Sequence, residues 1–156
     1  MLESVDQNVK NLRDKLEREG LAEDTLVVFF SDNGGLVQVT RNTPLRGGKG
    51  VLYEGGVREP MIVWWKGKVE GGRVSDVPVI GTDFYPTFLE LAGLEPPAGH
   101  VLDGKSLLPL LLDEPHQLNE RPLFWHFPNY MVANFMGFKV KSLSPSHSLL
   151  PLSKFF

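Results

Sequence analysis

The sequence predicts a three-layer α/β fold with a mostly parallel sheet, and three observations lead to that class. Residues 25–30 form an apolar run, TLVVFF, without the alternation of a half-exposed strand, which is typical of a strand buried on both faces. Residues 61–65, MIVWW, form a second such run. Two predicted helices, over residues 2–19 and 84–91, would cover this sheet.

The first helix is predicted from spacing alone. Its apolar positions step by three and four and are Leu2, Val5, Val9, Leu12 and Leu16. Gly20 stands where a C′ glycine would end the helix. The pattern lasts under three heptads, which argues against a coiled coil. The helix then leads into the run at residues 25–30 as an αβ unit docked on the sheet.

Composition limits the classes of function. The 156 residues are enough for one domain, and the net charge of −3 comes without a basic stripe or an acidic tract. We therefore expect no nucleic-acid partner. No apolar run approaches the length of a membrane span and no secretory signal pattern precedes the first helix, so no membrane association is expected. The chain has no cysteine, which excludes disulfides and thiolate metal sites.

Two hard oxygen donors follow the first predicted strand. Asp32 and Asn33 come directly after it and are followed by Gly34 and Gly35. Ligands gather outside the carboxyl ends of strands in open α/β sheets, and carboxylate and amide oxygens suit calcium. A plain turn is the alternative, because Asp, Asn and Gly are also common turn residues.

Glycine is concentrated just beyond this point. Seven of the sixteen glycines lie between Gly34 and Gly56, around the cations Arg46, Lys49 and Arg58. Glycine allows close backbone approach, so the cluster suggests an anion site built of backbone N–H groups and cationic side chains. A mobile surface loop is the competing interpretation.

The same stretch carries a resemblance to a known family. SDNGG, followed by PLRGGKGVLYEGGVREPMIVWW, resembles the C-terminal part of the catalytic domain of type I sulfatases, the arylsulfatase-like branch of the alkaline-phosphatase superfamily. The resemblance extends over about residues 1–130. It implies calcium ligation by Asp32 and Asn33 and a sulfate contact by Lys49. Arg46, Glu54 and Arg58 also match the motif, and we interpret them as residues that brace the loop.

The resemblance also implies a particular fold: a fragment of an alkaline-phosphatase-like three-layer sandwich, with the start of a small antiparallel C-terminal subdomain. We expect the catalytic part to span residues 1–118, and the subdomain with an irregular tail to span residues 119–156. The resemblance ends at Met131, and the unrelated tail suggests a truncated or frame-shifted reading frame. One alternating edge strand is expected at residues 138–141.

Between the second strand and the subdomain, two helices are predicted. Thr82 or Asp83 would cap the helix over residues 84–91, and we favour capping over catalysis for Asp83. Gly93 would stop this helix. Ser106 would cap a short leucine-rich helix at residues 107–112, with its proline in the first turn.

His126 is the histidine that could take part in catalysis. The resemblance places the end of its strand near the substrate pocket, where the imidazole could hold a leaving-group oxygen or a sugar hydroxyl. The alternative, which we prefer slightly, is a half-buried strand histidine among aromatic side chains.

The function implied is that of a sulfuric ester hydrolase for aryl or carbohydrate sulfates, whose partner is a sulfate-ester small molecule or glycan. The family's nucleophile is a formylglycine made within a C/S-x-P-x-R motif, which these residues lack, as they lack the paired aspartates that complete the calcium site. An inactive remnant, a subunit completed by another chain, and a phosphoesterase of the same superfamily remain alternatives. We also expect self-association through exposed sheet edges. Relatives are often periplasmic, secreted or lysosomal.

Overall fold

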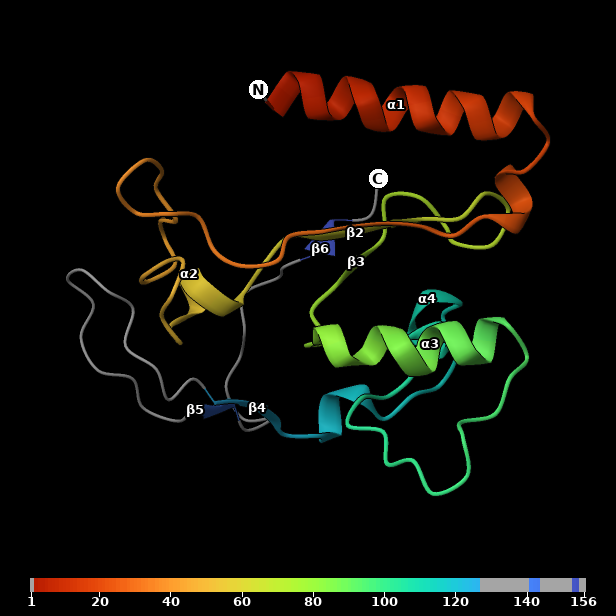
Figure 1. Cartoon of the computed structure of the whole chain (residues 1–156). Helices are drawn as coiled ribbons and strands as arrows, with labels where there is room; N and C mark the ends of the chain where they lie inside the picture. Colours follow the sequence, from red (N-terminus) through yellow and green to blue (C-terminus); the bar gives the residue numbers. More distant parts are fainter. Residues whose placement is uncertain (1, 127–140, 144–152, 155–156) are drawn as a thin grey trace.

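A computed structural model describes residues 2–126, 141–143 and 153–154 of the chain (Figure 1). Its helices and 3-10 turns are α1 (Leu2–Arg18), η1 (Ala22–Asp24), α2 (Glu54–Val57), η2 (Gly81–Asp83), α3 (Phe84–Leu91), α4 (Leu108–Leu111) and η3 (Leu118–Glu120). Its strands are β1 (Val27–Phe30), β2 (Met61–Trp64), β3 (Val74–Ser75), β4 (Leu123–Trp125), β5 (Lys141–Leu143) and β6 (Ser153–Lys154). None of the described helices has the length and apolarity that a membrane span requires.

The first helix forms and ends as predicted. Gly20 has a φ of 72° and donates its N–H to Glu17 O at 3.2 Å, while Leu21 N–H donates to Leu16 O at 2.9 Å. This pair of bonds is a Schellman motif, which needs a left-handed residue at C′. The apolar seam, however, is only lightly covered, because α1 has no fully buried residue and Leu2 is 84% exposed.

The two central strands pair with each other, but in the opposite direction to the one predicted. β1 and β2 are antiparallel, with Val27 opposite Trp64 and Phe30 opposite Met61. A parallel pair needs a crossover of a dozen or more residues, usually a helix that packs on the sheet. Residues 31–60 contain only the single-turn helix α2, so the chain returns along the strand that it has just left. The predicted parallel pairing is therefore wrong, and every pairing among the described strands is antiparallel.

The core lies on one face of β2. Met61 and Val63 are buried and pack against Leu107, Leu110, Leu111 and Leu118. Figure 1 shows α3 and α4 on this side of the β1–β2 pair and α1 on the other. The prediction that both helices cover the sheet is confirmed for α3, whose Phe84 packs against the core, but not for α1, which buries no residue. On the α1 side, the guanidinium of Arg13 lies 4.8 Å from the centre of the Trp64 ring.

The helices that close the core are held by their ends. Gly93, with a φ of 65°, ends α3, and Leu94 N–H donates to Leu89 O at 2.9 Å, as expected of a C′ glycine. The N-cap position of α4 is Leu107 and not the predicted Ser106. Ser106 nevertheless holds the start of the helix, because its Oγ accepts the Leu108 N–H at 3.1 Å.

The C-terminal strands are short. β4 pairs with β5 in an antiparallel ladder in which Leu123 faces Leu143, and β3 pairs with β6. Most of the edge strand predicted at residues 138–141 lies outside the described residues, and so does Met131, the predicted end of the resemblance. The predicted domain boundary between residues 118 and 119 stays a prediction.

Candidate functional site

The end of β1 presents the two predicted calcium ligands. Ser31 N–H donates to Pro60 O at 3.3 Å and so continues the β1–β2 pairing by one residue. The chain then turns, and Ser31 Oγ donates to Asn33 O at 3.2 Å. Asp32 is exposed and Asn33 is half-buried. The Asn33 side chain donates its Nδ2 to Gly34 O at 3.2 Å, which leaves its Oδ1 free to act as a ligand.

Beyond this turn, two distant stretches of backbone meet at a group of glycines that we call the glycine junction (Gly34, Gly35, Gly48, Gly55 and Gly56). Gly34 N–H donates to Gly56 O at 3.3 Å, Lys49 N–H donates to Gly35 O at 3.1 Å, and Gly55 N–H donates to Arg46 O at 2.8 Å. The side chain of Asn42 adds bonds to Gly35 O at 2.9 Å and Gly47 O at 3.0 Å.

These glycines are needed because the main chains approach too closely for side chains. A Cβ at Gly34 would lie 1.8 Å from Gly55 O, and one at Gly56 would lie 2.1 Å from Val51 O. Separations this short force the backbone apart. The mobile-loop interpretation is therefore wrong for the junction. The predicted anion site is also wrong for the amides of Gly34, Lys49 and Gly55, because they donate to carbonyls of the loop itself.

The main chain of Lys49 is held by a hydrogen bond, and its side chain is exposed. Its N–H bond to Gly35 O holds its backbone against a residue two positions beyond Asn33. The ammonium group extends from a fixed backbone position, and Lys49 is exposed. We predict that the side chains of Asp32, Asn33 and Lys49 converge at the carboxyl end of β1, and this stays a prediction, because the structure gives only the main-chain bond from Lys49 to Gly35.

The other three motif residues, Arg46, Glu54 and Arg58, make contacts that brace the loop. The guanidinium of Arg46 lies 3.9 Å from the centre of the Tyr53 ring, a cation–π contact that ties the start of the loop to its end. Glu54 lies 3.8 Å from a guanidinium nitrogen of Arg58, one turn along α2.

A cavity of about 580 Å³ opens beside this site, and Asp32 lies on its lining. Glu59 lies there too, and burial together with the negative charge of Asp32 raises the pKa of its carboxyl to about 7. Arg58 is buried, which lowers the pKa of its guanidinium. Sequence reasoning did not single out Glu59. The available signal was that Arg58 and Glu59 are adjacent charges separated from the second apolar run by Pro60 alone.

The donor set suits calcium in kind but is too small. Asp32 and Asn33 offer a carboxylate oxygen and an amide oxygen, the hard ligands that calcium prefers. Calcium takes six to eight oxygen ligands. Across the part of the chain that the structure describes, no three His, Cys, Asp or Glu side chains cluster as a metal site. These two residues therefore fit as part of a calcium site whose other ligands would come from elsewhere.

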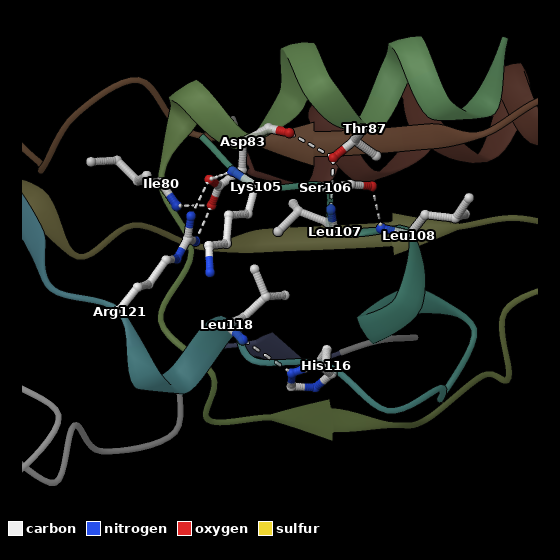
Figure 2. Close-up of polar contacts among 10 residues, drawn as sticks. All are labelled: Ile80, Asp83, Thr87, Lys105, Ser106, Leu107, Leu108, His116, Leu118 and Arg121. Carbon is white, nitrogen blue, oxygen red and sulfur yellow. Dashed lines mark hydrogen bonds and ion pairs between the residues drawn. The ribbon is translucent and has the colours of Figure 1, made fainter. Parts of the chain in front are cut away.

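Two further residues behave differently from expectation. His126 lies directly after β4 and is exposed, whereas the alternative interpretation expected a half-buried ring. Asp83 occupies the N-cap position of α3 but makes no side-chain bond to that helix. Figure 2 shows its carboxylate paired with Arg121, with one oxygen 2.5 Å from Nη1, and bonded to the N–H groups of Ile80 and Lys105.

A hydroxyl extends this network. Thr87 Oγ1 donates to Asp83 O at 2.6 Å and accepts the Leu107 N–H at 2.8 Å, as Figure 2 shows. Asp83 thus ties the start of α3 to the segment before α4 and to Arg121. Its role is structural, which agrees with the prediction that it is not catalytic, although capping is not how it acts.

Comparison with known proteins shows which family the chain resembles. The sulfatase family model matches residues 1–94, and the model of the C-terminal region of N-sulphoglucosamine sulphohydrolase matches residues 48–141. The second match extends past Met131, so the predicted end of the resemblance at that residue is wrong. A sulfatase of Formosa agariphila is 42% identical over 83% of this chain, and dog N-acetylgalactosamine-6-sulfatase is 38% identical over 85%.

Structural similarity agrees with the sequence similarity. The crystal structure of Ps i-CgsB in complex with k-i-k-neocarrahexaose superposes with a TM-score of 0.70 and 37% identity over 82% of this chain and 29% of the other. The chain spans 26% of the length of each of the two curated relatives. Because a family model matches more than half of these residues and the site motif lies inside the match, the chain belongs to the sulfatase family.

Proposed function

We propose that this chain supplies part of the active site of a sulfuric ester hydrolase that acts on carbohydrate sulfates. Its family membership supports the reaction class. The N-acetylgalactosamine-6-sulfatase relative and the oligosaccharide complex support a sugar rather than an aryl substrate. The observation that carries the proposal is the main-chain bond from Lys49 N–H to Gly35 O, which holds the backbone of a lysine near the Asp32–Asn33 turn.

In this proposal, Lys49 holds the sulfonate oxygens of the substrate. A lysine ammonium is a compact, strongly hydrated charge on a flexible stem, so it is effective only where its backbone is fixed. The main-chain bonds of the glycine junction supply that fixation, together with the Asn42 side chain, which donates to Gly35 O and Gly47 O. A preorganised cation stabilises the charge that develops on the transferring group, which is often the largest single contribution to catalysis.

Asp32 and Asn33 would hold part of a calcium site. A bound calcium ion would add a second positive charge and polarise the sulfonate oxygens. His126, which is exposed just beyond β4, is proposed to contact the leaving-group oxygen or a sugar hydroxyl. Its neighbour Trp125 lines the cavity, which keeps this histidine close to the candidate site.

The nucleophile must come from outside these residues. The chain has no cysteine and no serine in the C/S-x-P-x-R setting, so positioning groups alone cannot perform the reaction. The second candidate, a subunit or remnant that is inactive alone, is favoured by the same observation. The two proposals agree on what Lys49 does once the rest of the site is present.

A chimeric enzyme tests the proposal. Residues 1–130 of this chain would replace the matched region of dog N-acetylgalactosamine-6-sulfatase, with the parent enzyme as positive control. We expect Lys49→Ala to lower kcat for sulfate release by about 10²–10³-fold, the usual cost of losing one such group. Arg41→Ala, which removes an exposed cation from the same loop, is the matched control and should change little. Unchanged kcat in Lys49→Ala, or faster turnover of a phosphate monoester than of the sulfate, would contradict the proposal.

A further inference from the structure

The glycine-rich loop carries positive charge without a matching acid. Between Asp32 and Glu54 the sequence has three cations, Arg41, Arg46 and Lys49, and no aspartate or glutamate. The chain as a whole has a net charge of −3. All three cationic residues are exposed, and none of their side chains forms a hydrogen bond or an ion pair with another described residue. The loop is therefore a positive surface on a weakly acidic chain, and such a surface attracts anions.

Arg46 is the cation of this loop whose guanidinium is fixed. It lies 3.9 Å from the centre of the Tyr53 ring. Main-chain bonds hold both partners, because Arg46 O accepts the Gly55 N–H at 2.8 Å and Tyr53 O accepts the Gly56 N–H at 2.8 Å. A guanidinium stacked on a ring keeps its five N–H donors in its own plane, where the ring does not use them. Arg46 thus presents unused donors from a prearranged position.

One hydrogen-bonded group holds the backbone of Arg46 close to that of Lys49. Asn42 Nδ2 donates to Gly47 O, beside Arg46, at 3.0 Å. It also donates to Gly35 O at 2.9 Å, and the same oxygen accepts the Lys49 N–H at 3.1 Å. Only three peptide units join the two cations, so their Cα atoms are at most about 11 Å apart. Two long cationic side chains so placed can hold two anionic groups of one ligand.

The carboxylates that flank the loop in sequence do not occupy Arg46. Asp32 and Glu54 both line the cavity beside the candidate site, and that lining includes neither Arg46 nor Lys49. Glu54 pairs instead with Arg58, at 3.8 Å. An anion that binds Arg46 therefore displaces no carboxylate of the described residues.

We propose that Arg46 binds a second anionic group, a sulfate or a carboxylate, on the glycan whose scissile sulfate is held by Lys49. A guanidinium offers paired donors that match such oxyanions, whereas an ammonium acts as a point charge. Arg46 then selects multiply charged glycans over those that carry the scissile sulfate alone. The inference rests on the proposed function and adds a specificity-determining residue to it.

The chimeric enzyme that carries residues 1–130 tests this inference through KM. Three substrates would be compared: N-acetylgalactosamine 6-sulfate, its 4,6-disulfate, and a disaccharide that joins a glucuronate to the 6-sulfate. We expect Arg46→Gln to raise KM for one or both of the doubly charged substrates by about tenfold or more, as loss of a charged hydrogen bond does. Neither kcat nor the KM for the 6-sulfate should change appreciably. A response to the disulfate identifies a second sulfate as the ligand, and a response to the disaccharide identifies a carboxylate.

Two matched comparisons separate recognition from loop structure. Arg41→Gln removes an exposed arginine from the same loop and should leave all three KM values unchanged. Tyr53→Phe keeps the ring against Arg46 and should behave like the chimera without substitutions. Tyr53→Leu removes the ring, so it should raise the same KM values that Arg46→Gln raises.

Equal changes of KM for all three substrates in Arg46→Gln, or no change for any, would overturn the inference. A lower Tm without a selective change of KM would also overturn it, since Arg46 would then serve the structure alone. If Arg46→Gln did not fold, Arg46→Lys would give the same comparison, because it keeps the charge and loses the paired donors. Lys49→Ala tests the proposed function separately, since it should lower kcat for all three substrates whatever Arg46 does.

Discussion

Replacing Arg121 with methionine should strongly destabilise the chain, because it leaves the buried carboxylate of Asp83 without its counter-ion. Asp83 is 0% exposed and receives two guanidinium N–H groups from Arg121, one of them at 2.5 Å. The variant keeps the two backbone donors, Ile80 N–H at 2.9 Å and Lys105 N–H at 3.0 Å. It loses both charge-assisted bonds.

The size of the stability loss depends on the hydrogen bonds that Asp83 keeps in Arg121→Met. Breaking a buried ion pair by removing one partner costs about 3–5 kcal/mol. Because two backbone donors still solvate the carboxylate of Asp83, we expect the lower end of that range for Arg121→Met. A loss of about 3 kcal/mol lowers the Tm of a domain of this size by roughly 10 °C.

Urea denaturation followed by tryptophan fluorescence would measure this loss as a shift of the midpoint at constant slope. Lys10→Met is the matched control, since it breaks an ion pair with Asp14 in which both side chains are about half exposed or more, at 63% and 49%. It should leave the midpoint almost unchanged. The double variant Asp83→Asn/Arg121→Met should recover part of the loss, because no charge is then left buried. If Arg121→Met matched the Lys10→Met control, the ion pair would not hold these segments together.

Three other outcomes are expected. Gly34→Ala should lower the free energy of unfolding by about 3 kcal/mol or more, because its Cβ would lie 1.8 Å from a carbonyl oxygen and would displace the backbone. Gly71→Ala is the control, since its Cβ would meet nothing within 4 Å, and it should be neutral in the same urea titration. Raising the pH through the window from 4.5 to about 7 should destabilise the wild type relative to Glu59→Gln, since a carboxyl with a raised pKa loses its contribution as it ionises. The full shift corresponds to roughly 3 kcal/mol, and solvent screening of this half-buried group reduces it to about 1–2 kcal/mol; parallel stability curves for the two proteins would contradict this. The 156 residues alone should show no sulfatase activity and should self-associate through the edge of β1 that is unpaired among the described strands. Turnover of an aryl sulfate by a protein that light scattering shows to be a monomer would refute both statements.

The positions of the elements could be read from the sequence because each depends on local signals. Helical spacing and a C′ glycine place α1 and α3, and apolar runs place β1 and β2. The direction of pairing could not be read in this way. An unbroken apolar run predicts burial on both faces but not the direction of pairing. The predicted burial is also wrong for β1, whose Phe29 and Phe30 are 39% and 41% exposed. The deciding feature was the connection, residues 31–60, which folds back on itself at the glycine junction instead of forming a long helix that crosses the sheet.

The candidate site divides in the same way. Asp32, Asn33 and Lys49 could be chosen from their residue types and their places in a glycine-rich motif, and the structure adds the backbone bond that brings them near one another. Arg58 was chosen as a bracing residue, but its lack of a hydrogen bond appears only when its burial is known. Pairings across 38 residues, such as that of Asp83 with Arg121, have no local signal, because they depend on how distant segments pack.

The glycine junction has a consequence for how this loop can tolerate sequence change. The position of Lys49 is set by main-chain bonds and by the absence of side chains at a few positions, and most loop side chains do not contribute to it. Residues 36–41 are exposed, but the side chains of Val37 and Thr40 lie against Gly48 and Gly35. The other positions of this segment can therefore vary in sequence, and substrate contacts can change there, while the backbone that carries the lysine stays in place.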